Sequence, residues 1–364
     1  MTRAVFLNGR FLGQSVSGVQ RFSLEITAAI DRLMAGSEWP RTIVLTPRMA
    51  GADAGVGIAS SFKRLQLQEV GRLRGHLWEQ TELPGASRDG VLLNLGNTGP
   101  MLTGQRQVVV IHDAGVFDTP ESYSLRFRAW YKALQHCLVR TGAQVATVSK
   151  FSRDRIVARL GLDPERIVVV YEGADHILRA QADPSVLERH GLRPRQFALV
   201  VSNRVAHKNL STLQGAAAAL ERRGMAIAVA GASQAAVFQG IDGLGFAERR
   251  LGRVSDAELR ALYENAVCLL FPSRYEGFGL PPVEAMACGC PVLAAGGNAV
   301  EEICGDSALY FDNARKQTIV DAIERLLDEP GLADMLRARG WVRTTGLSWD
   351  ASARRLGDAV RRVR

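Results

Sequence analysis

The sequence lacks long hydrophobic runs and is poor in cysteine, and both absences narrow the class of protein. No apolar run reaches the ~20 residues that a helix needs to cross a bilayer. The apolar part of the first residues, MTRAVFLNGRFLG, is too short for a signal peptide and is more typical of a first strand. The five cysteines are odd in number and follow no framework spacing. We therefore expect a protein of the reducing cytoplasm.

Several motifs for nucleotides, nucleic acids and metals are also missing. No G-x-G-x-x-G follows the first predicted strand, and no G-x-x-x-x-G-K-[ST] occurs. These absences count against nicotinamide or flavin enzymes and against phosphate-loop nucleotidases. Without a zinc finger or an RNP-type motif, nucleic acid is not the expected partner. Cys288 and Cys290 have no second ligand pair, so we interpret them as small apolar residues beside a strand.

The chain has 364 residues and a net charge of +8. This length exceeds what one hydrophobic core usually serves, so we expect two domains. Much of the positive charge lies in RLRG, residues 72–75, and in ARRLGDAVRRVR, residues 353–364. Such a balance suits an anionic ligand or an anionic membrane surface. A solvated helix face without a partner is the alternative.

Short apolar runs alternate with amphipathic stretches, which predicts parallel sheets covered by helices. In the first half, the predicted strands cover residues 4–8, 42–46, 90–95, 107–113, 143–149 and 166–173. After a polar segment near 174–195 the rhythm restarts with QFALVVSN, AIAVAGA, CLLFPS and CPVLAAGG. The predicted fold is therefore α/β with two doubly wound Rossmann-like domains. We expect the active site where the carboxyl ends of their strands face a cleft.

The stretch RYEGFGLPPVEAMACGCPV, residues 274–292, predicts a loop that becomes a helix. Gly277 and Gly279 permit positive φ or a close approach to a ligand, and the double proline suits a first helical turn. Glu284 would lie in that turn, near the positive end of the helix dipole. The free N–H groups there could receive a phosphate. The alternative is an ordinary helix start with a solvated Glu276.

Polar residues also follow the predicted strands. His112 and Asp113 come directly after the aliphatic run VVVI, and SGVQR, residues 17–21, is a turn before a helix. Arg204 and Lys208 lie four residues apart on a loop that opens into a helix, where both could face one anion. A satisfied buried histidine and an ordinary basic helix start are the corresponding alternatives.

Together these segments resemble the retaining, nucleotide-sugar-dependent glycosyltransferases of the GT-B fold, in the large bacterial class that includes mannosyltransferases. The resemblance spans nearly the whole chain in the family's order. Its most specific element is the pair of glutamates separated by seven residues, Glu276 and Glu284. The matching segments are SGVQRF, VVVIHD, VATVSKFSRDRI, RIVVVYEGAD, VSNRVAHKNL, LGRVSDAELRALYENAVCLLFPS, SRYEGFGLPPVEAMACGCPVLAA and EEICGDSALYFD.

The resemblance implies a catalytic set of four residues. Arg204 and Lys208 would stabilise the negative charge that develops on the diphosphate leaving group. Glu276 would face the hydroxyls of the donor sugar, and His112 would contact that sugar from the N-terminal domain. Retention is expected to proceed by front-face attack, so Glu276 positions the donor and is not a nucleophile.

The resemblance also implies donor-binding residues. Glu284 would accept hydrogen bonds from the ribose hydroxyls. The backbone of the turn would meet the sugar and the distal phosphate through Gly277, Phe278, Gly279 and Leu280. The other residues expected on the donor side or near the phosphates are Gly18, Asp113, Ser202, Arg253 and Val254. No D-x-D element suggests a metal site, so we expect no metal and no cofactor.

We expect an acceptor-side domain over residues 1–175, a nucleotide-sugar domain over 176–345, and a C-terminal helix over 346–364 that packs back on the first. GHLWEQTELPG and LGNTGPM resemble a subgroup that builds bacterial surface polysaccharides. GDP-mannose is the preferred donor, with a saccharide or lipid-linked oligosaccharide as acceptor. UDP- or dTDP-sugars remain alternatives, as do a nucleotide-sugar epimerase, a non-catalytic binding subunit and a phosphorylase of this fold.

Overall fold

The computed structural model of the protein describes residues 4–48, 62–202, 206–231 and 248–363. Its contacts divide the chain into two compact units. Unit 1 comprises Met1–Glu172 and Trp349–Arg364, and unit 2 comprises Gly173–Ser348. These divisions lie within a few residues of the boundaries expected from the sequence.

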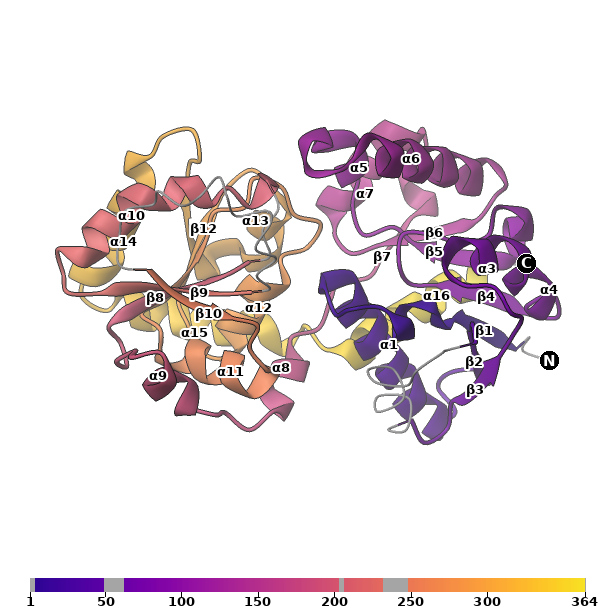
Figure 1. The fold of residues 1–364 in the computed structure, drawn as a ribbon, viewed down its shortest axis with the longest axis horizontal. Coiled ribbons are helices and arrows are strands. Elements are labelled where there is room, and N and C mark those ends of the chain that lie inside the picture. The colour runs from indigo at the N-terminus through magenta and orange to yellow at the C-terminus, as the bar shows by residue number, and fades with distance from the viewer. Residues whose placement is uncertain (1–3, 49–61, 203–205, 232–247, 364) are drawn as a thin grey trace. The chain divides into compact units, whose positions relative to one another are not determined.

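The described part of unit 1 contains a seven-stranded parallel sheet in the order β3-β2-β1-β4-β5-β6-β7 (Figure 1). In its middle, Leu7 of β1 pairs with Val44 of β2 on one side and Leu93 of β4 on the other. The central strands are buried, as their aliphatic runs predict. The strands are β1 Val5–Asn8, β2 Thr42–Thr46, β3 Gln66–Glu69, β4 Val91–Asn94, β5 Gln107–Val110, β6 Gln144–Thr147 and β7 Val168–Val169.

Helices cover the sheet of unit 1. Leu134, Leu138 and Ile156 pack on Val109 and Val145, so α6 and α7 cover β5 and β6. The C-terminal helix α16, yellow in Figure 1, packs against α1 and the end of the sheet, as expected. The helices are α1 Gly18–Ala35, α3 Gly75–Thr81, α4 Leu83–Ala86, α5 Gly115–Asp118, α6 Leu125–Arg140, α7 Lys150–Leu160 and α16 Trp349–Arg362.

Unit 2 repeats the design with six described strands, all parallel, in the order β10-β9-β8-β11-β12-β13. Leu293 of β12 lies between Leu270 of β11 and Leu309 of β13. The strands are β8 Phe197–Val201, β9 Ala226–Ala230, β10 Glu248–Gly252, β11 Cys268–Phe271, β12 Val292–Ala295 and β13 Ala308–Phe311. With two such sheets, the predicted doubly wound α/β class is confirmed.

Helices α10 and α14 lie on one side of the unit 2 sheet, and α9 and α11 on the other (Figure 1). Leu220 and Ile323 bury the first pair against Val200 and Leu293. Helix α11 begins with a capping box formed by Ser255. The helices are α8 Asp175–Arg179, α9 Ser185–Arg189, α10 Leu213–Glu221, α11 Asp256–Asn265, α12 Leu280–Ala287, α13 Ala299–Cys304, α14 Gln317–Asp328 and α15 Leu332–Thr345.

Candidate active site

The strand order of unit 2 identifies where a ligand would bind. From β8 the chain winds outward to β10, and it then restarts at β11 and winds the other way to β13. The winding direction therefore reverses between β8 and β11, which are neighbours in the sheet. Doubly wound sheets bind ligands at the carboxyl ends of the strands at such a reversal. The loops that follow β8 and β11 carry Lys208 and Glu276.

Lys208 and Glu276 form an ion pair at this point. The Lys208 Nζ lies 2.5 Å from the Glu276 Oε1, and each side chain is 13% exposed. The same ammonium lies 5.3 Å from the centre of the Phe271 ring, which adds a cation–π contact. The Arg274 N–H donates to the His207 carbonyl at 2.8 Å, so backbone contact also joins the two loops. The structure thus brings together two predicted catalytic residues that are far apart in sequence.

Asparagine amides hold the surrounding loops in place. Asn209 has a positive φ of 51°, which asparagine tolerates better than most residues. Its Nδ2 donates to Asn313 after β13, which in turn donates to the Pro272 carbonyl after β11. Asn298, after β12, donates to the Ser273 carbonyl at 3.0 Å. Loops from four strands therefore fix the backbone around the ion pair.

The Gly-Phe-Gly turn has the backbone that the sequence suggested. Gly279 has φ 98° and caps α12, whose first turn contains the double proline. A Cβ at Gly279 would come within 2.9 Å of Val300 Cγ2, so both conformation and space require glycine. Phe278 is buried and Leu280 begins the helix. Among the described residues, no side chain caps this helix. The two prolines have no N–H, so the backbone donors at this end are those of Gly279 and Leu280.

Glu284 differs from its predicted position. It is the fifth residue of α12 and not part of the first turn, because the helix begins at Leu280. The side chain is buried, and its carboxylate meets His176 Nε2 at 2.8 Å and accepts from the Tyr263 hydroxyl at 2.9 Å. Burial, reinforced by the nearby carboxylate, raises the pKa of Tyr263 well above its usual value. Glu284 therefore connects α12 to α8 and α11.

The other predicted donor residues of unit 2 lie on loops at strand ends. Ser202 follows β8, and its N–H donates to the Ala230 carbonyl at 2.9 Å. Arg253 is exposed and Val254 half-buried between β10 and α11. Arg204 lies outside the described residues.

In unit 1, the predicted residue His112 is buried after β5. Its Nε2 lies 2.8 Å from the Leu95 carbonyl, its N–H donates to Asn97, and its Nδ1 is 3.7 Å from Glu172. Phe22 of α1 meets the ring edge-on at 4.7 Å. The ring is thus firmly oriented, which both the catalytic role and the alternative of a satisfied buried histidine would require.

Asp113 and Gly18 occupy helix starts in unit 1. The Asp113 carboxylate accepts from the Gly115 N–H at 2.6 Å, at the start of α5. Gly18 is the first residue of α1, and a Cβ there would meet no atom within 4 Å among the described residues.

A buried polar network in unit 1 was not assigned a role from the sequence. It lies where the winding of the first sheet reverses, between β1 and β4. Glu79, which is fully buried, accepts from Asn8 at 2.8 Å and from Thr98 at 2.9 Å. Arg10 Nε lies 3.3 Å from the same oxygen, and His76 Nδ1 lies 3.1 Å from the other. In the sequence, the only indication of this network was the family resemblance of GHLWEQTELPG and LGNTGPM, whose residues meet here.

The pKa of Glu79 is lowered despite the burial of its side chain. Burial by itself would raise its pKa, but hydrogen bonds from His76, Asn8 and Thr98 and the charge of Arg10 outweigh it and lower the pKa. The folded-state pKa lies below the unfolded one, so the charge stabilises the fold above the ordinary glutamate pKa. This contribution is lost as the pH falls through the folded-state pKa.

Glu79→Gln is therefore expected to destabilise unit 1 by about 2–4 kcal/mol at pH 7, because Arg10 loses its buried counter-charge. The difference from the unmodified protein should shrink progressively below about pH 4.5. Urea unfolding of both proteins between pH 7 and pH 3 measures it. A difference independent of pH would show that Glu79 is not ionised in the fold.

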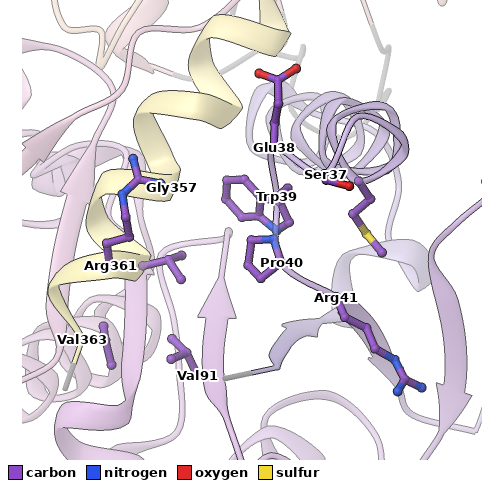
Figure 2. A pocket seen from close by; sticks show the side chains of 11 residues that line it. Ser37, Glu38, Trp39, Pro40, Arg41, Val91, Gly357, Arg361 and Val363 are labelled. Atoms are coloured by element: carbon purple, nitrogen blue, oxygen red, sulfur yellow. The ribbon is translucent and has the colours of Figure 1, made fainter. Parts of the chain in front are cut away.

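Unit 1 also contains a cavity of about 830 Å³ at the opposite, amino-terminal edge of its sheet (Figure 2). It is lined by Trp39 and Pro40 together with Val91, the first residue of β4, and Gly357 of α16. A Cβ at Gly357 would come within 3.1 Å of the Trp39 ring, so glycine lets α16 approach this ring closely. The cavity lies at the amino ends of the strands and is therefore separate from both ligand-binding positions, which lie at carboxyl ends.

Within the described part of the chain, no helix is long and apolar enough to span a membrane. No group of three or more histidine, cysteine, aspartate or glutamate side chains in the same part of the chain could hold a metal ion. Cys290 is buried, and burial raises the pKa of its thiol, which agrees with a small apolar role.

Comparisons with known proteins identify the family. Residues 187–341 match the family described as Glycosyl transferases group 1. The chain is 31% identical over 259 residues to O-antigen chain mannosyltransferase B of Escherichia coli, with 68% of each protein covered. It is 28% identical over 279 residues to O-antigen chain mannosyltransferase RfbU of Salmonella typhimurium, covering 71% of this chain and 74% of the relative.

The fold has solved counterparts. The structure of Anabaena HepE in complex with UDP and glucose matches with a TM-score of 0.75 at 16% identity, and all of both chains is covered. At this identity the likeness concerns the fold, and the sequence relatives provide the family. The chain therefore belongs to the group 1 glycosyltransferases and is a glycosyltransferase of the GT-B fold.

Proposed function

We propose that the protein transfers mannose from GDP-mannose, with retention of configuration and without a metal ion, in the synthesis of a bacterial surface polysaccharide. The acceptor would be a saccharide or a lipid-linked oligosaccharide. Similarity to two O-antigen chain mannosyltransferases supports the sugar and the pathway class. The observation that carries the site is the Lys208–Glu276 pair at the winding reversal of unit 2.

Departure of the diphosphate needs stabilisation of negative charge. Lys208 is proposed to provide the positive charge, together with Arg204, which lies outside the described residues. The Lys208 ammonium is largely shielded from water, which strengthens its interaction with a developing negative charge. A fixed cation of this kind can do what a metal ion does in other transferases.

The remaining parts of the donor have proposed partners on the same loops. Glu276 would bind the sugar hydroxyls and orient Lys208. The N–H groups of Gly279 and Leu280 at the start of α12 would meet the distal phosphate, supported by the turn that requires glycine at position 279. Glu284 would serve the ribose in addition to holding its helices. His112 is proposed to contact the donor sugar, and the departing phosphate oxygen would take the acceptor proton.

Contact with an anionic membrane surface is a further part of the proposal. The arginines of α16 are its candidate contacts because they are exposed. Arg354, however, pairs with Glu38 at 2.7 Å, and Arg355 pairs with Asp358 at 2.7 Å. Such surface pairs are weak enough to exchange for lipid phosphates.

Turnover of the candidate donors tests the proposal. The protein is incubated with GDP-mannose, UDP-glucose or dTDP-rhamnose, and release of each nucleoside diphosphate is measured. GDP-mannose is expected to turn over fastest. Faster release from UDP-glucose or dTDP-rhamnose would identify that sugar nucleotide as the donor in place of GDP-mannose. Formation of an epimerised nucleotide sugar without release of the diphosphate would point to an epimerase.

The same assay tests metal independence. Addition of EDTA is expected to leave GDP release unchanged, because a protein cation takes the role of the metal. Loss of activity that magnesium or manganese restores would contradict this part of the proposal. Dialysis without chelator provides the control for nonspecific effects.

A further inference from the structure

The buried ion pair between Glu79 and Arg10 is not the most stable way to fill this part of the fold, which suggests a functional role. Burying a carboxylate and a guanidinium removes both from water, and hydrophobic residues of similar size often give equal or greater stability. Here Glu79 is completely buried and the Arg10 side chain is 13% exposed. The network occupies the carboxyl ends of β1 and β4, the ligand-binding position of a doubly wound sheet. Both features are typical of a binding site.

Arg10 is oriented by its partners yet retains capacity to donate. Its Nη2 donates to Thr98 at 2.8 Å, its Nε faces Glu79, and its Nη1 lies 3.3 Å from His76 Nε2. Tyr131 is a fourth partner. A guanidinium has five N–H groups, so these four partners leave a donor for a ligand. His76, 35% exposed, forms the accessible side of the network.

Aromatic rings stand directly beside these polar groups. The Trp130 ring of α6 meets His76 edge-on at 5.7 Å, and Tyr131 meets it at 6.0 Å. Trp130 is 36% exposed, so part of its ring is open to a ligand. A hydrogen-bonding group next to an aromatic surface suits a molecule with one apolar face and a polar rim. Sugar rings have this chemistry, with C–H groups on their faces and hydroxyls around them.

We propose that Arg10, His76 and Trp130 form the binding site for a sugar of the acceptor, with Glu79 holding Arg10 and His76 in position. The ligand class is a saccharide whose hydroxyls meet Arg10 and His76 while a ring face packs on Trp130. The inference rests on the proposed glycosyl transfer and adds the residues of unit 1 that select the acceptor.

Saturation-transfer NMR on the full-length protein tests the site. The probes are the methyl glycosides of mannose, N-acetylglucosamine, galactose and rhamnose. At least one is expected to bind the unmodified protein. Arg10→Lys keeps a counter-charge for Glu79 but removes the forked donor, and Trp130→Ala removes the ring. Each variant should weaken that binding by about tenfold or more. Trp341→Ala, which removes a 62% exposed tryptophan from α15, is the matched control.

Two results would overturn the inference: no methyl glycoside binds, or both variants bind as well as the control. Melting with GDP on the same samples separates this outcome from failure of the proposed function. GDP reports on unit 2, so its melting shift should persist in Arg10→Lys and Trp130→Ala. If a sugar binds but GDP does not shift the melting temperature, the proposed site of unit 1 stands and the proposed donor is contradicted.

Discussion

Replacing Lys208 by alanine is expected to lower sugar transfer by at least about a hundredfold, the usual scale for one lost electrostatic donor in a shielded site. Two effects combine in this variant. The developing diphosphate charge loses a cation, and Glu276 loses the ammonium that lies 2.5 Å from its carboxylate. An unpaired Glu276 would then repel the anionic leaving group, which deepens the loss.

The rate of GDP release from GDP-mannose measures this effect. Arg222→Ala is the control, because it removes an exposed cation of unit 2 whose nearest acidic partner, Glu324, is 3.7 Å away. Lys208→Arg keeps the charge and should recover part of the rate. Turnover near the unmodified level in Lys208→Ala would remove Lys208 from the catalytic set. Near-normal turnover in Arg204→Ala as well would contradict the proposal that these two residues stabilise the charge on the leaving group.

Replacing Glu284 by alanine is expected to affect both stability and nucleotide binding. The substitution removes the carboxylate that meets both the Tyr263 hydroxyl and the His176 Nε2 inside the protein. Each buried hydrogen bond lost in this way costs about 1–3 kcal/mol. For a unit of this size, a total near 3 kcal/mol corresponds to a melting temperature lower by about 6–12 °C. Loss of the ribose acceptor should weaken GDP binding in addition.

Tyr263→Phe separates the two effects of the Glu284 substitution. It removes one hydroxyl from the network but leaves the carboxylate, so it should cost about 1 kcal/mol and retain GDP affinity. Calorimetric titration with GDP, at a temperature where all variants are folded, measures the affinity. Equal affinity in Glu284→Ala and the unmodified protein would restrict Glu284 to holding α8, α11 and α12 together.

The sequence predicted the interior of each sheet better than its margins. TIVLT coincides with β2, and the helix expected after the turn SGVQR is α1. The three strands that the pattern missed, β3, β10 and β13, all lie at sheet edges. Strand β3, QLQE, is exposed at every residue and so contains no apolar run to detect. Hydrophobic periodicity indicates which side chains are buried. An edge strand can form through backbone hydrogen bonds while few of its side chains are buried.

The candidate sites show a similar limit. The family resemblance singled out Lys208 and Glu276, but only the adjacency of β8 and β11 brings them into contact. Arg10 and Glu79 meet through the adjacency of β1 and β4, for which local spacing carries no signal. Glu284 was placed one turn too early, because the helix starts before the double proline. Contacts between distant segments depend on sheet order, which local patterns do not encode.

Thermal melting with GDP, UDP, dTDP and ADP, each with and without magnesium, tests the proposed donor site of unit 2. GDP is expected to raise the melting temperature by about 5 °C or more when it is present at about a hundred times its dissociation constant, and magnesium is expected to add nothing. A shift with another diphosphate would contradict the donor assignment. A shift that requires magnesium, or no shift with any of the four, would contradict the proposed metal-independent donor site of unit 2.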